Sequence, residues 1–81
     1  MEVKALFFSR LRDVVGENEV AMDLHEKATV ADLMEALYAR TPELRSWDQN
    51  ILVGIGVEFV ARSHSLKHGD EVAIMPPLQG G

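Results

Sequence analysis

The residues best placed to do chemistry are the last ones, because Gly80-Gly81 ends the chain shortly after Pro76-Pro77. Proline fixes φ and lacks a backbone N–H, which favours an extended exit, and glycine has no side chain. Such an arm could place a bare carboxylate in a narrow channel of another protein. The alternative is an inert, frayed end. With glycine at roughly 7% of residues, a chance Gly-Gly end is expected in about 0.5% of chains, so the tail is a real candidate.

A terminal carboxylate is a poor acyl donor until it is converted to a mixed anhydride such as an acyl-adenylate. The sequence contains no phosphate-binding loop, so another protein must activate Gly81. An amine attacking the activated carbonyl would give a protein conjugate, whereas a sulfur donor would give a thiocarboxylate. We therefore expect Gly81 to be the reactive residue and the chain to be a cosubstrate rather than an enzyme by itself.

Other candidate sites are weak. Gly54-Ile55-Gly56 lacks the third glycine and the following helix of a dinucleotide-binding fingerprint. His25, His64 and His68 fall in predicted loops without the spacing of metal ligands. No serine has the context of a nucleophile, and no carboxylate pair is placed for acid–base chemistry. We expect no bound metal or cofactor.

Length and composition indicate one ordinary globular domain of 81 residues, with 47% hydrophobic and 26% charged residues. The net charge of −5 disfavours nucleic acid and anionic lipid and favours a basic partner surface. The absence of cysteine excludes disulfides, thiolate metal sites and a cysteine nucleophile. No signal peptide or membrane-spanning run is evident, so we expect a cytoplasmic protein.

Hydrophobic periodicity predicts the elements that position the tail. Alternation predicts strands over residues 2–8 and 19–24, paired as a hairpin. Between them a short helix is expected over residues 10–15, with Ser9 as its cap and Gly16 as its stop.

The main helix is predicted to begin at Thr29-Val30-Ala31-Asp32, which resembles a capping box, and to end before Pro42. Trp47 is expected to plug the edge of the core rather than to form a ligand platform. The inward-facing apolar positions of the helix follow helical spacing: Val30, Leu33, Met34, Leu37 and Tyr38.

Three further strands are predicted over residues 51–55, 58–60 and 71–75. The resulting fold class is α+β, with one main helix packed on one face of a mixed sheet. We expect a domain over residues 1–75 and a flexible tail over residues 76–81.

A second candidate site lies on the sheet. If the first and last strands are neighbours, Phe8 and Met75 face away from the main helix, and Phe59 can join them from the fourth strand. An apolar patch there would suit a partner interface. The alternative is that Phe8 and Phe59 are core residues. Arg12 either flanks this patch or is simply solvated.

With these features assembled, the chain resembles the MoaD family, the small subunit of molybdopterin synthase. The resemblance spans essentially all 81 residues. It rests on the opening Leu6–Gly16, on Leu66–Ala73 with its Gly-Asp-Glu-Val, and on Pro-Pro-x-x-Gly-Gly at residues 76–81. It implies a ubiquitin-like β-grasp fold and a sulfur carrier.

The resemblance also implies partners and roles. In that family a MoeB-like enzyme uses ATP and Mg²⁺ to adenylate the terminal glycine, here Gly81, and sulfur from a donor protein then replaces AMP. The tail enters the large subunit, MoaE, to form a heterotetramer in which the sulfur converts cyclic pyranopterin monophosphate to molybdopterin. Gly80 would keep the thread narrow. The residues expected to set its reach and fill the channel entrance are Pro76, Pro77, Leu78 and Gln79.

Several alternatives stay open. Sulfur carriers for thiamine synthesis, tRNA thiolation and cysteine synthesis share this fold and the Gly-Gly end, although Pro76-Pro77 favours the molybdopterin branch over the thiamine branch. A ubiquitin-like protein modifier and an interaction domain with an inert tail are the other possibilities. One departure from the MoaD pattern is Gly56, where that family often has asparagine.

Overall fold

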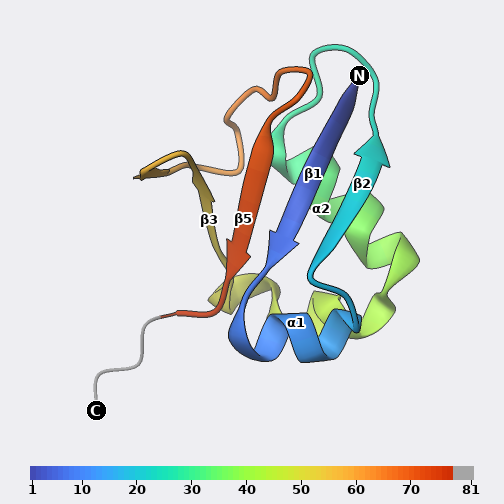
Figure 1. Cartoon of the computed structure of the whole chain (residues 1–81), viewed down its shortest axis with the longest axis vertical. Helices are drawn as coiled ribbons and strands as arrows, with labels where there is room; N and C mark the ends of the chain where they lie inside the picture. The colour runs from blue at the N-terminus through green and yellow to red at the C-terminus, as the bar shows by residue number, and fades with distance from the viewer. Residues whose placement is uncertain (78–81) are drawn as a thin grey trace.

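The computed structural model describes residues 1–77, which form one five-stranded sheet covered on one face by a helix (Figure 1). The strands are β1 (Glu2–Phe7), β2 (Glu19–Asp23), β3 (Leu52–Ile55), β4 (Glu58–Phe59) and β5 (Glu71–Met75). The helical segments are α1 (Ser9–Val15), α2 (Val30–Arg40) and the 3₁₀ segment η1 (Pro42–Asn50). The expected α+β class, with one main helix packed on a mixed sheet, is confirmed.

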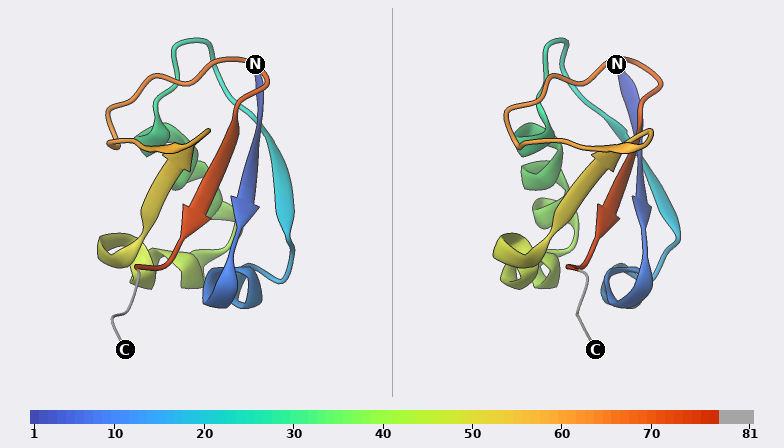
Figure 2. Two further views of the ribbon diagram at one scale, coloured as in Figure 1. Left: turned by 60° about the vertical axis from the view of Figure 1, so that its left-hand side comes forward. Right: turned by 90° about the vertical axis from the view of Figure 1, so that its left-hand side faces the viewer.

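The strand order is β2-β1-β5-β3-β4, so the first and last strands lie side by side at the centre of the sheet. β1 and β5 pair in parallel, and the other neighbouring strands pair antiparallel. Because side chains alternate along a strand, Val3, Ala5 and Phe7 of β1 and Val72 and Ile74 of β5 point into the core beneath α2. Figure 2 shows α2 on this face of the sheet only.

The start of α2 is fixed by the capping box that the sequence predicts. The backbone N–H of Asp32 donates to the Thr29 hydroxyl at 3.3 Å, and the N–H of Thr29 donates to the Asp32 carboxylate at 2.8 Å. These hydrogen bonds satisfy donors that a helix N-terminus leaves free. The bond from the Thr29 backbone is the main reason that the pKa of Asp32 lies below its usual value. All five predicted inward-facing positions of α2 are buried.

One expectation for α1 is wrong. Ser9 does not cap this helix; it is already the first helical residue, and Phe8 occupies the cap position without a side-chain hydrogen bond. The reason is that the N–H of Leu11 donates to the carbonyl of Phe8 at 3.1 Å, so the first turn of the helix already includes Ser9. The expected stop is confirmed: Gly16 has a φ of 86°, in the left-handed region that glycine adopts readily.

A polar network ties η1 to the rest of the fold. The Tyr38 hydroxyl on α2 donates to a carboxylate oxygen of Asp48, and the Arg62 guanidinium donates to the same oxygen at 2.9 Å. The hydrogen bond from Tyr38 is the main cause that lowers the pKa of Asp48, followed by the one from Arg62. Burial, followed by the Asp48 carboxylate, raises the pKa of Tyr38 to about 12. The network holds the segment that carries Trp47, which packs at the edge of the core as predicted.

Candidate functional site

In residues 1–77 no helix covers the face of the sheet opposite α2 (Figure 2). The residue composition of this face changes from one end to the other. Residues paired across neighbouring strands share a face. Toward the start of β1 the paired residues are charged, with Lys4 opposite Glu71. Toward the end of β5, where the chain leaves the sheet, they are apolar. The apolar rows pair Leu6 with Ala73, Ala73 with Gly54, Gly54 with Phe59, and Leu52 with Met75.

This apolar end forms a groove of about 400 Å³ on the protein surface. Phe8 is 44% exposed and Phe59 is 66% exposed, so neither is a core residue. Met75 lies half-buried between them. We call the apolar patch the set of apolar residues that line this groove: Phe8, Leu52, Phe59, Met75, Pro76 and Pro77.

A second hollow on the same face, of about 350 Å³, extends the patch toward the hairpin between β3 and β4. Gly54 lies among its lining residues, and a Cβ at this position would approach the Met75 methyl at 3.2 Å and the Glu58 carbonyl oxygen at 3.3 Å. The absence of a side chain at Gly54 therefore lets Met75 and Phe59 meet across β3. At the hairpin tip, Val57 is fully exposed, at 103%.

Sequence reasoning did not identify Leu52, Gly54 or Val57 as part of this surface. Leu52 had a usable signal, because it alternates with the inward-facing Ile51 and Val53. Gly54 and Val57 had no such signal in the sequence, because a glycine and a turn residue are both expected in any hairpin. The hairpin itself is as predicted, and Gly56 has a φ of 64°, a conformation that asparagine also tolerates.

The root of the tail lies beside the apolar patch. Pro76 and Pro77 follow β5 directly, are half-buried, and leave the domain between α1 and η1 (Figures 1 and 2). The remaining predicted tail residues, Leu78, Gln79, Gly80 and the reactive Gly81, lie outside the described residues. The roles of all the tail residues, and the tail boundary at residue 76, stay predictions.

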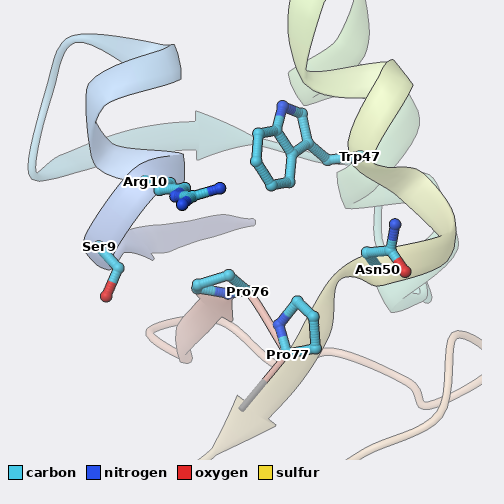
Figure 3. Close-up of a pocket in the computed structure, with 6 residues that line it drawn as sticks. All are labelled: Ser9, Arg10, Trp47, Asn50, Pro76 and Pro77. Atoms are coloured by element: carbon cyan, nitrogen blue, oxygen red, sulfur yellow. The ribbon is translucent and has the colours of Figure 1, made fainter. Parts of the chain in front are cut away.

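On the other side of the prolines is a second cleft of about 400 Å³, which is lined by polar side chains as well as apolar ones. We call it the polar cleft. Figure 3 shows the Arg10 guanidinium on α1 reaching toward the ring of Trp47 on η1, with the two prolines below them. The residues that line it are Ser9, Arg10, Trp47, Asn50, Pro76 and Pro77. The two grooves therefore share Ser9 and both prolines.

The described residues, 1–77, lack two further kinds of feature. Within this range no three His, Asp or Glu side chains are grouped so that they could hold a metal ion. Over the same residues, no helix has the length and apolar character needed to cross a membrane.

Comparison with known proteins agrees with this geometry. The sheet order and the single helix that covers the sheet in residues 1–77 define a ubiquitin-like β-grasp domain, as the resemblance implied. Two solved structures match closely. SAMP1 of Haloferax volcanii, a small archaeal modifier protein, has a TM-score of 0.89 and 31% identity, with 100% of both chains covered. Subunit 1 of a putative molybdopterin converting factor from Pyrococcus furiosus has a TM-score of 0.88 and 28% identity, covering 96% of this chain and 99% of that one.

The sequence pattern of the ThiS family matches residues 5–81, and the chain belongs to that family. Among its relatives is the molybdopterin synthase sulfur carrier subunit of Chlamydomonas reinhardtii, which is 39% identical over 83 residues with 100% of both chains covered.

Proposed function

We propose that this chain is the sulfur-carrier subunit of a molybdopterin synthase and that Gly81 carries the sulfur as a C-terminal thiocarboxylate. The observation that carries the proposal is the position of the apolar patch directly beside the root of the Pro-Pro tail. The full-length likeness to a sulfur carrier subunit supports the same function. The chain by itself has no catalytic role in this scheme.

The apolar patch is the proposed seat of a MoaE-type large subunit. Phe8, Phe59 and Met75 would pack against the partner, because exposed aromatic side chains around a shallow groove are typical anchors of protein interfaces. Pro76 and Pro77 would then direct the tail into the partner, with the residues up to Gly80 threading its channel. The complex would be a cytoplasmic heterotetramer.

The proposed reaction begins with a MoeB-type enzyme, ATP and Mg²⁺. The Gly81 carboxylate attacks the α-phosphorus of ATP, which releases pyrophosphate and leaves an acyl-adenylate. Sulfur at the oxidation level of hydrosulfide, supplied by a sulfur donor protein, then attacks the carbonyl carbon, the bond to AMP breaks, and a thiocarboxylate results. In the large subunit the sulfur passes to cyclic pyranopterin monophosphate, and water restores the carboxylate.

The test is the intact mass of the protein after incubation with a MoeB-type enzyme, Mg-ATP and a sulfur source. Replacement of oxygen by sulfur adds about 16 Da, which is also the gain from oxidation of a methionine. Because the chain has four methionines, the control is the same protein without Gly81. We expect a gain that depends on both Gly81 and ATP, and molybdopterin formation on addition of a MoaE-type subunit and precursor. A gain that persists without Gly81 would contradict the proposal.

A protein modifier is the second candidate, because the likeness to SAMP1 extends over the full length of both chains. In that case the activated Gly81 carbonyl would be attacked by a lysine amine, with loss of AMP and formation of an isopeptide bond. The same activation mixture, supplemented with cell extract, separates the two functions. Gly81-dependent conjugates of higher mass without molybdopterin formation would favour the modifier.

A further inference from the structure

The polar cleft is not used by the proposed function, although it borders the same tail. Its walls come from two elements, with Arg10 on α1 and with Trp47 and Asn50 on η1. Figure 3 shows these side chains gathered around Pro76 and Pro77. The Trp47 ring and the prolines supply apolar surface, and the guanidinium and the amide supply hydrogen-bond donors.

The guanidinium of this cleft differs from three other arginines of the chain. Three arginines elsewhere have carboxylate partners: Arg40 pairs with Glu17 at 3.0 Å, Arg45 with Glu35 at 2.8 Å, and Arg62 with Asp48 at 2.9 Å. Within residues 1–77 the structure gives no such partner for Arg10 and no hydrogen bond for the Asn50 amide. The Arg10 charge is therefore available to an acidic group of another molecule.

We propose that the polar cleft receives an aspartate or glutamate side chain of the protein that accepts the tail. This inference rests on the proposed function, because it requires a partner to hold the tail. The two grooves share Ser9, Pro76 and Pro77, so a partner seated on the apolar patch and gripping the tail also covers the cleft. The partner surface is then basic overall, which complements the net charge of −5 on this chain, and acidic where it meets the polar cleft.

The chemistry of the cleft suits a carboxylate. A guanidinium binds a carboxylate through two parallel N–H bonds, and such charge-assisted bonds fix geometry as well as adding affinity. The Asn50 amide can donate to the same group. Apolar contacts on one side of the prolines and an ion pair on the other would set the direction in which the tail enters the partner.

The experiment measures binding of the full-length chain to a MoaE-type large subunit by calorimetry, at low salt and at high salt. We expect Arg10→Gln to weaken binding about tenfold or more at low salt, because the partner's acid loses its counter-charge. Asn50→Ala should weaken it by a smaller factor, and Arg10→Lys should recover part of the loss. Wild-type affinity should fall as salt is added, and Arg10→Gln should be less sensitive to salt.

Arg40→Gln is the control for charge, since it removes the same charge from the C-terminal end of α2, outside the residues that line the cleft. Thermal unfolding checks each variant, and Arg10 is exposed, so its replacement should not change the melting temperature. Wild-type affinity for both Arg10→Gln and Arg10→Lys would overturn the inference and leave the proposed function intact. An equal loss in Arg40→Gln would also overturn it, because the effect would then be one of total charge. Failure of the wild-type chain to bind would overturn both.

Discussion

Phe7 and Phe8 are neighbours in the sequence with opposite environments. Phe7 is 3% exposed and lies in the core beneath α2, whereas Phe8 is 44% exposed on the open face of the sheet. The alternation of side chains along β1 produces this difference. Phe59, on the edge strand β4, is exposed as well. An apolar side chain on the surface contributes little to the free energy of unfolding. Substitutions of Phe8 and Phe59 should therefore affect partner binding, whereas a substitution of Phe7 should affect stability.

We therefore predict that Phe7→Ala lowers the free energy of unfolding by about 3–5 kcal/mol, as expected for a buried phenylalanine. Phe8→Ala and Phe59→Ala should change it by about 0.5 kcal/mol or less, because surface substitutions have small effects. Both should weaken binding to a MoaE-type subunit. Chemical denaturation and calorimetry measure the two quantities. A large loss of stability in Phe59→Ala would contradict the assignment of this residue to the apolar patch.

At the scale of elements, α2 and η1 are joined by the network of Tyr38, Asp48 and Arg62. Tyr38 is buried, and its neutral hydroxyl is favoured in the folded state, where its pKa is about 12 instead of the usual 10.0. The corresponding stabilisation is present below pH 10 and is lost as the pH rises from 10 toward 12. The hydrogen bond from Tyr38 to Asp48 holds η1 in place, and η1 forms one wall of the polar cleft.

Tyr38→Phe tests the network because it removes only the hydroxyl. We expect a loss of about 1 kcal/mol near neutral pH, the usual value of one such hydrogen bond. Between pH 10 and 12 the wild-type chain should lose stability faster than the variant, since only the wild type has this group to titrate. Lysines titrate in the same range, so the difference between the two curves is the quantity to measure. Parallel curves would show that Tyr38 does not titrate in this way.

At the scale of the whole molecule, the first buried residue of the core in the sequence is Val3 and the last is Ile74. The core includes residues from every helical segment and from four of the strands. β5 is central in the sheet and pairs with both β1 and β3. All residues of the buried core therefore precede Pro76 in the sequence. The tail can then react without being needed for folding.

We predict that truncation after Pro77 changes the free energy of unfolding by about 0.5 kcal/mol or less, because no side chain of the buried cluster is removed. The same truncation should abolish the Gly81-dependent mass gain. Truncation after Asp70 is the contrasting control, since it removes β5 and should prevent folding. Denaturation curves and intact mass measure both effects. A clear loss of stability on truncation after Pro77 would contradict the division at residue 76.

Much of the fold was predictable because its signals are local. Alternation marked the strands, helical spacing marked the buried face of α2, and Thr29 with Asp32 marked its start. The error at Ser9 is one residue, because the N–H of Leu11 donates to the carbonyl of Phe8 and the helix starts one residue earlier than local capping rules indicate. Phe8 is held at this position by a residue far away in the sequence, since its N–H donates to the carbonyl of Ile74.

The sequence by itself determined the reactive candidate, Gly81, and the proline-rich approach to it, because backbone restriction and the lack of a side chain are properties of the residues themselves. The tertiary structure decided which apolar residues are core and which are surface. It placed Phe8, Phe59 and Met75 together by bringing β1, β5, β3 and β4 side by side. It also formed the polar cleft, since Arg10 and Trp47 are far apart in the sequence and meet only when α1 and η1 pack around the end of β5.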